Sequence, residues 1–188
     1  MQTSKNKKTE FFIALAFVLL GAALRLIPHA PNFVPIGALA LFAGTYFSRK
    51  TALFLPLAAM AVSDIFLGFY DPKIMAAVYV CFIFSVLLGF WLKKRKKWQT
   101  ILGAAVLSSV VFFLATNFAV WIFTSWYEKT FFGLLQCYIM ALPFFKNTLF
   151  GDLFYASVFF SAFEFSKALA GKFLLRRSAD SISKIGTI

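Results

Sequence analysis

The strongest constraint on this chain is a series of long apolar runs that contain almost no charged residues. They span residues 11–27, 33–47, 51–69, 74–92, 101–124 and 147–170. A helix needs about 20 apolar residues to cross the hydrocarbon core of a bilayer. Hydrophobic residues make up 61% of the chain and charged residues 14%, which leaves too little polar surface for a soluble domain of this size. The sequence therefore predicts an all-α integral membrane protein with six transmembrane helices.

The basic residues predict how these six helices are oriented. Most of the 19 Lys and Arg residues fall in the N-terminal tail, in the connections at 49–50 and 93–97, and from residue 172 onward. With six spans, all four places lie on one side of the membrane, and the positive-inside rule assigns that side to the cytoplasm. We therefore expect a multi-pass membrane protein with both termini in the cytoplasm.

Two segments are ambiguous in this topology. The run at 33–47 is short for a span, so either neighbouring helices shelter it or the bilayer thins around it. The run FFGLLQCYIMALPFF at 131–145 would, as a full span, move the last basic cluster to the other side. We therefore expect an outer capping segment at 125–146, between the fifth and sixth spans. The expected organisation is a cytoplasmic basic tail at 1–10, one transmembrane domain at 11–174 and a cytoplasmic tail at 175–188.

Polar residues within the apolar runs gather near the helix ends that lie opposite the basic connections. A charge inside the bilayer costs at least about 2.5 kcal/mol, so Arg25, Asp64 and Asp152 should face protein or a cavity. These three residues form either a structural ion-pair network or part of a ligand pocket, where polar and aromatic groups converge at one depth. A channel would need polar residues through the full thickness. The candidate substrate-binding residues are His29, Asn32, Asp64, Tyr79, Cys81, Asn117, Trp121, Asn147, Asp152 and Tyr155.

The stretch LIPHAPNFVP at 26–35 holds the only histidine and half of the six prolines. Prolines end helices and stiffen turns, so His29 and Asn32 would stand on a pre-ordered loop at the mouth of a pocket. The alternative is that His29 only caps carbonyl groups of the first helix. Likewise, Asn117 could join two helices by a hydrogen bond, and Trp121 could belong to the interfacial aromatic belt.

Cys81 also has two interpretations. It lies on a stripe of small residues, with Ser85 and Gly89, that lets helices approach closely. A thiol is also a soft ligand for a metal ion that a substrate carries. Two cysteines provide neither a zinc site nor a disulfide framework.

Two functional classes are disfavoured by what the sequence lacks. It has no phosphate-binding glycine loop followed by Lys and Ser or Thr, and so no ATPase motif of that type. Its net charge of +12 lies at the ends of apolar runs rather than on an organised basic face, so nucleic acid is not an expected partner. The expected surroundings are those of the lipid bilayer.

Four stretches resemble the substrate-binding subunits (S-components) of energy-coupling-factor vitamin transporters. They are RLIPHAPNFVPIGALALFAGTYF at 25–47, LPLAAMAVSDIFLGFYD at 55–71, TNFAVW at 116–121 and LPFFKNTLFGDLFY at 142–155. Together they are similar to a bacterial family of S-component-like membrane proteins. The resemblance implies a subunit that binds a vitamin from outside and works with an energy-coupling membrane subunit and two ATPase subunits.

The cobalamin-binding branch of these proteins resembles the chain in two respects. It has a His in the first outer loop, matched by His29, and a membrane Cys that meets the cobalt, for which Cys81 is the nearest candidate. The resemblance therefore implies cobalamin as the substrate, Cys81 as a ligand of its cobalt, and no cofactor of the chain's own. Two other functions stay open: a non-transport membrane scaffold or assembly protein, and an intramembrane enzyme that modifies a lipid or, through Cys81, a bound cofactor.

Overall fold

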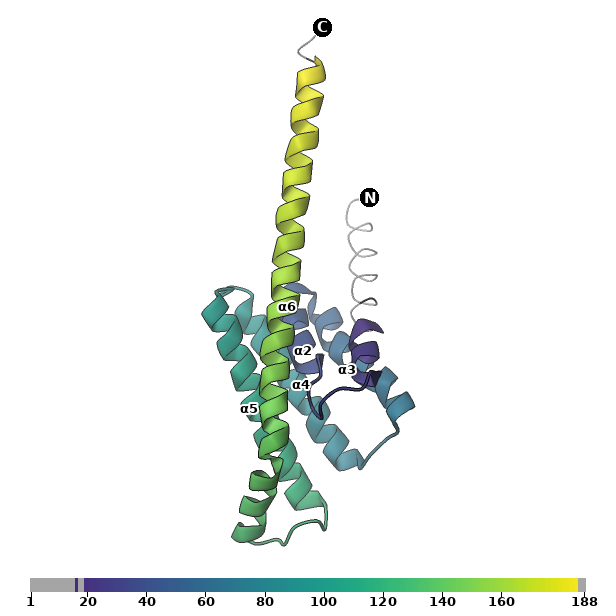
Figure 1. Ribbon diagram of the computed structural model, residues 1–188, viewed down its shortest axis with the longest axis vertical. Helices are drawn as coiled ribbons and strands as arrows, with labels where there is room; N and C mark the ends of the chain where they lie inside the picture. The colour runs from purple at the N-terminus through teal and green to yellow at the C-terminus, as the bar shows by residue number, and fades with distance from the viewer. Residues whose placement is uncertain (1–15, 17–18, 186–188) are drawn as a thin grey trace.

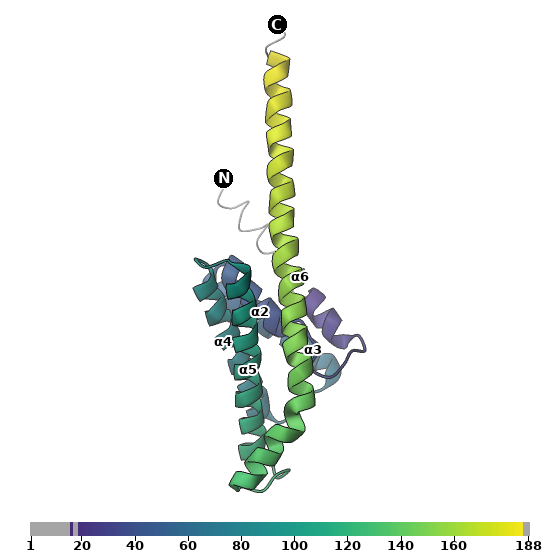
Figure 2. The same ribbon diagram turned by 60° about the vertical axis from the view of Figure 1, so that its left-hand side comes forward.

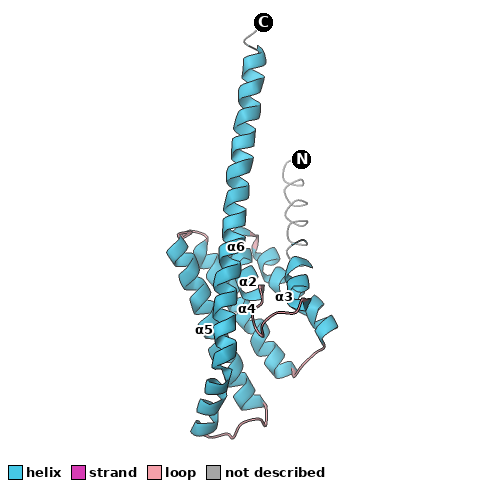
Figure 3. Ribbon diagram, viewed as in Figure 1, coloured by secondary structure: helices cyan, strands magenta, loops and turns pink. Residues whose placement is uncertain are grey.

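The computed structural model describes the backbone at residues 16 and 19–185, and the side chains of these residues up to residue 165. Within this part of the chain every regular element is a helix (Figure 3). Residues 19–26 are helical, and the later helices are α2 (Ile36–Tyr46), α3 (Arg49–Leu67), α4 (Pro72–Leu92), α5 (Trp98–Phe123) and α6 (Phe131–Ile185) (Figure 1). The predicted all-helical class is confirmed. The tail at 1–10 and residues 11–15, 17 and 18 of the first predicted span lie outside the described residues.

Three of these helices are long and apolar enough to cross a bilayer. α3 has 19 residues, α4 has 21 and α5 has 26, close to the roughly 20 that a span requires. Large apolar side chains such as Phe54, Phe66 and Leu114 are exposed on these helices, as expected where a helix faces lipid. These features mark the chain as a membrane protein. They also agree, to within a few residues, with the third, fourth and fifth predicted spans.

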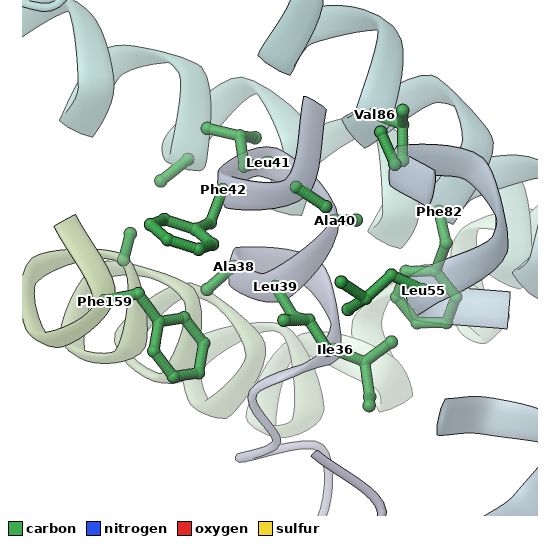
Figure 4. Packing of buried hydrophobic residues seen from close by; sticks show 14 of the residues in the cluster. Ile36, Ala38, Leu39, Ala40, Leu41, Phe42, Leu55, Phe82, Val86 and Phe159 are labelled. Carbon is green, nitrogen blue, oxygen red and sulfur yellow. The ribbon is translucent and has the colours of Figure 1, made fainter. Parts of the chain in front are cut away.

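α2 is the centre of the fold. Every residue from Ile36 to Thr45 is buried, because α3, α4, α5 and α6 all contact this helix. Figure 4 shows its side chains pointing in several directions, with Leu55, Val86 and Phe159 among the residues that surround them. Eleven residues make a helix of about 16 Å, which is well short of a hydrocarbon core of about 30 Å. Neighbouring helices shelter this short run, which was one of the two predicted solutions.

α2 and α4 cross in close contact through two glycines. A Cβ added to Gly44 would lie 2.8 Å from Gly89 Cα, and a Cβ added to Gly89 would lie 2.8 Å from Gly44 Cα. Thr45 Oγ1 donates across the crossing to the carbonyl oxygen of Gly89 at 3.2 Å. The backbones can approach this closely only because neither glycine carries a side chain. The predicted packing role of this part of the small-residue stripe is confirmed.

α6 runs through the expected boundary between an outer cap at 125–146 and a sixth span at 147–170. Phe131–Ile185 is one continuous helix, which also extends through most of the expected tail at 175–188. Pro143 lies inside this helix, and Figure 2 shows that the helix bends near its beginning. A proline removes one backbone hydrogen bond and kinks a helix, but neighbouring helices keep the helix intact.

The α2–α3 and α4–α5 connections lie at the same end of the bundle, as six alternating helices require (Figure 1). Lys93 Nζ donates to the carbonyl oxygen of Phe47 at 2.9 Å. Lys96 Nζ lies 4.5 Å from the ring centroid of Tyr46. We call this the basic end; its basic residues are Arg49, Lys50 and the five residues at 93–97. The α3–α4 and α5–α6 connections point the other way (Figure 1).

Candidate functional site

A cavity of about 490 Å³ lies between the helices on the side away from the basic end. We call it the outer cavity. The segment before α2 and helices α3 to α6 all contribute to its walls. Its aromatic lining comes from Tyr70, Phe82, Phe112, Phe113, Phe144 and Phe145. The other polar lining residues are Arg25, His29, Asn32, Thr116, Asn117 and Thr148. Apolar walls with a few convergent polar groups are typical of small-molecule sites, which commonly enclose about 300–1,000 Å³.

A narrow inner pocket of about 40 Å³ adjoins the outer cavity and shares part of its lining. The shared residues are Asn32, Val34, Phe82, Phe112 and Thr148. The inner pocket is lined in addition by Gly37, Ser85, Ser108 and Asp152. It has room for a few water-sized groups, so it suits a slender polar substituent and not the body of a ligand.

Arg25 and Asp64 form a buried ion pair beside the outer cavity. Arg25 Nη1 donates to Asp64 Oδ1 at 2.5 Å and to Ser63 Oγ at 2.6 Å. The Tyr79 hydroxyl donates to Asp64 Oδ2 at 3.1 Å. Asp64 is 1% exposed and Arg25 is 16% exposed, so the arginine alone reaches the cavity. The ion pair joins the segment before α2 to α3. The hydrogen bond from Tyr79 links α4 to the same carboxylate.

Asp152 takes no part in this ion pair. Ser109 Oγ donates to Asp152 Oδ2 at 2.7 Å, and the backbone N–H of Ala38 also donates to the carboxyl group. Ala38 lies in the first turn of α2, where backbone N–H groups have no partner within the helix. A carboxylate at this position also interacts favourably with the helix dipole. Asp152 therefore caps α2 from α6, and the predicted network of three charges is corrected to one pair and one separate cap.

His29 lines the outer cavity and also lies against the end of the first helical segment. Its Nε2 is 3.1 Å from the carbonyl oxygen of Arg25, and its Nδ1 is 2.9 Å from that of Ala30. His29 therefore contacts a carbonyl group at the end of the first helical segment, and its ring also forms part of the cavity wall.

Asn32 and Asn147 hold the elbow at 26–35 in place. Asn32 lines both cavities and has a φ of +64°, in the left-handed region that Asn adopts more readily than most residues. Asn147 Nδ2 donates to the carbonyl oxygen of Pro31 at 3.0 Å, which fastens the elbow to α6. These contacts position the elbow as one wall of the cavity.

Burial raises the pKa of Tyr70, in the α3–α4 connection, and the negative charge of Asp64 raises it further. The hydroxyl group of Tyr70 is therefore neutral near pH 7, where it can both donate and accept a hydrogen bond at the cavity wall.

The structure brings together most, but not all, of the predicted site residues. Those that line a cavity are His29, Asn32, Asn117 and Asp152. Those that hold a lining residue or the elbow in place are Asp64, Tyr79 and Asn147. The remaining three, Cys81, Trp121 and Tyr155, are absent from both linings and make none of these positioning hydrogen bonds.

These last three residues each have different surroundings. Cys81 is buried in α4, with an exposed fraction of 4%. Trp121 Nε1 donates to the carbonyl oxygen of Glu128 at 2.9 Å. The ring of Tyr155 lies 5.6 Å from the ring of Phe33. Among the residues that the structure describes, no group of three or more His, Cys, Asp or Glu is placed to hold a metal ion.

Comparison with known proteins gives a family but no activity. A family model described as a family of unknown function (DUF6580) matches residues 5–173. The chain belongs to the DUF6580 family. No curated protein and no solved structure matches the chain. Every residue that lines the two cavities lies within the matched range, so the site is part of the region shared with the family model.

The predicted site residues do not include the two serine hydroxyl groups that line the inner pocket of this DUF6580 protein. Ser85 Oγ and Ser108 Oγ lie 2.5 Å apart at the contact between α4 and α5. The sequence alone places Ser85 on the small-residue stripe, because a single Ser on an apolar helix is typical of a packing residue. A usable signal was present: Ile74, Val78, Phe82 and Ser85 follow helical spacing along one face of α4, and all of them line a cavity.

Proposed function

We propose that this protein binds a vitamin-sized molecule in the outer cavity, as the substrate-binding membrane subunit of an uptake transporter of the energy-coupling-factor type. The observation that supports it best is the outer cavity itself, which has a volume of about 490 Å³ and a lining that is mainly apolar. A cavity of this size with a few convergent polar groups suits a small organic ligand better than an ion. The resemblance seen in the sequence supplies the transporter class.

The lining also indicates the chemistry of the ligand. Phe82, Phe112 and Phe113 suit an aromatic ring or another flat apolar body, since aromatic rings stack on one another. The side-chain amide of Asn117 can donate and accept hydrogen bonds with a polar edge of that body. The inner pocket would receive one slender polar substituent, held by hydroxyl groups such as that of Ser108.

Cobalamin is the specific substrate that the resemblance implies, and it remains part of the proposal. It is larger than the outer cavity, so only one part of the molecule would enter and the rest would extend beyond the mouth. Cys81 lines neither cavity, so the proposal does not use it as a cobalt ligand. If cobalamin binds in this way, the absorption spectrum of its cobalt should be the same in the wild-type protein and in Cys81→Ala.

Transport would require partners that supply energy, because the sequence has no ATPase motif. We propose an energy-coupling membrane subunit and ATPase subunits in this role. The protein would lie in the bacterial cytoplasmic membrane, with the basic end inside and the outer cavity facing outward.

Native mass spectrometry of protein purified from its own host tests this proposal. Val78 lines the outer cavity, whereas Val80, on the same helix, is 63% exposed on the lipid side. We expect a bound small molecule in the wild-type protein and in Val80→Trp, and its loss in Val78→Trp, which fills the cavity. A wild-type protein without a bound molecule, or a Val78→Trp variant that retains it, would contradict the proposal. A thermal-shift panel of vitamins that includes cobalamin would then identify the ligand.

A membrane scaffold is the second candidate function, and the bonding of the buried charges favours it. The carboxyl groups of Asp64 and Asp152 both find hydrogen-bond partners within the chain, which is the arrangement expected of structural residues. A scaffold protein would retain no specific ligand, so the same mass-spectrometry experiment distinguishes the two functions.

A further inference from the structure

A second large cavity lies between α4 and α5, near the basic end. It has a volume of about 480 Å³ and shares no lining residue with the outer cavity. Leu87, Leu88 and Trp91 line it from α4, and Gly103 and Leu107 line it from α5. We call it the α4–α5 groove. Its walls are almost entirely apolar, so a polar ligand has little to bind there.

Gly103 leaves the α5 side of the α4–α5 groove open, because it has no side chain. A Cβ added to Gly103 would meet no atom within 4 Å. Gly103 and Trp91 are both exposed, so the groove faces the lipid that surrounds the bundle. From Phe84 to Trp91 it follows α4 for about 10 Å, which is long enough to hold a stretch of a hydrocarbon chain.

The groove ends at the most basic segment of the described chain. Residues 93–97, which join α4 to α5, are all Lys or Arg and all exposed. The guanidinium carbon of Arg95 lies 4.6 Å from the ring centroid of Trp91, and Trp91 is itself part of the groove wall. The first turn of α5 contains no acidic residue, and its N-cap, Lys97, makes no side-chain capping bond. The positive end of the α5 dipole therefore adds to the positive charge of the connection.

We propose that the α4–α5 groove binds one acyl chain of an anionic phospholipid, whose phosphate lies against residues 93–97. An apolar groove within the bilayer suits a hydrocarbon chain, and adjacent basic side chains suit an anionic head group at the membrane surface. A second copy of this chain is a poorer occupant, because each copy carries a net charge of +12 and the same basic end. This proposal does not depend on whether the outer cavity binds a vitamin.

Quenching of Trp91 fluorescence by brominated lipids tests the proposal. Replacing Trp98, Trp121 and Trp126 by Phe leaves Trp91 as the only tryptophan. The protein is placed in vesicles that contain phosphatidylcholine and phosphatidylglycerol at equal mole fraction. In one preparation the phosphatidylcholine carries brominated acyl chains, and in the other the phosphatidylglycerol does. We expect brominated phosphatidylglycerol to quench Trp91 more strongly than brominated phosphatidylcholine.

Three further substitutions are made in this background. They separate the contribution of the groove to the lipid preference from that of the basic α4–α5 connection. Gly103→Leu fills the groove and should abolish the preference for phosphatidylglycerol. Arg95→Gln should weaken it about fivefold, which corresponds to about 1 kcal/mol for one basic residue at the membrane surface. Lys50→Gln is the matched control, because Lys50 is exposed at the same end but lies outside the α4–α5 connection; it should leave the preference unchanged.

Several results would overturn the proposal. Equal quenching by the two brominated lipids would show that the head group is not recognised. A Gly103→Leu variant that kept the preference would show that the groove is not the site. Absence of quenching by either lipid would show that protein, and not lipid, covers Trp91.

Discussion

The ion pair between Arg25 and Asp64 can be tested by a double-mutant cycle. Asp64→Asn removes the charge of a carboxylate that is 1% exposed, and Arg25→Met removes its partner. Breaking a buried pair by removing one partner typically costs about 3–5 kcal/mol, because the remaining charge is left uncompensated. Water in the outer cavity can solvate the Arg25 charge that Asp64→Asn leaves unpaired. The Tyr79 hydroxyl still donates to the Asp64 carboxylate that Arg25→Met leaves unpaired. We therefore expect the lower end of that range for both substitutions.

The expected values follow from this geometry. Each single substitution should lower the free energy of unfolding by about 3 kcal/mol. The double substitution leaves no unpaired charge, so it should cost about 4 kcal/mol rather than the sum of the two single effects. The resulting coupling energy is about 2 kcal/mol, which is within the range for residues in direct contact.

The assay is reversible unfolding in mixed detergent micelles, followed by circular dichroism. Glu128→Gln is the control, because Glu128 is an exposed acidic residue whose substitution should change stability by less than about 0.5 kcal/mol. If the two single effects simply added in the double variant, the pair would not be coupled. Arg25 would then not hold the segment before α2 against α3.

Two further substitutions test the packing around α2. Gly44→Ala places a methyl group against the backbone of α4, so it should lower the free energy of unfolding by about 3 kcal/mol. Gly103→Ala, where the space is open, should instead leave it unchanged or raise it by up to about 1 kcal/mol, because Ala has the higher helix propensity. Equal effects of the two substitutions would contradict the close crossing. Asp152→Asn retains the shape of the side chain but leaves one oxygen to accept from both Ser109 and the Ala38 N–H, so it should cost about 1–2 kcal/mol in the same unfolding assay, whereas an unchanged stability would argue against the cap.

The sequence predicts the parts of this fold that depend on local composition. The runs that form α3, α4 and α5 are apolar over a length that matches a bilayer, so their positions follow from the sequence alone. The need to compensate a buried charge predicts that Arg25 and Asp64 have partners, and their ion pair meets that need.

Other features depend on packing between distant segments, which leaves no local pattern. Asp152 caps a helix that begins more than 100 residues earlier in the chain, so its sequence neighbours carry no sign of this role. Pro143 locally favours a break, yet α6 continues through it. Whether Cys81 faces a cavity depends on the rotation of α4, which the stripe of small residues did not determine.

The most direct test of the account is to determine which face of the membrane the outer cavity opens to. Cys81 and Cys137 are both buried, and replacing them by Ala gives a background without thiols. Asn32→Cys then reports on the cavity wall, and Lys94→Cys reports on the basic end. In intact cells, a membrane-impermeant maleimide should label residue 32, and it should label residue 94 only after the cells are permeabilised. Labelling of residue 94 but not of residue 32 in intact cells would contradict the account.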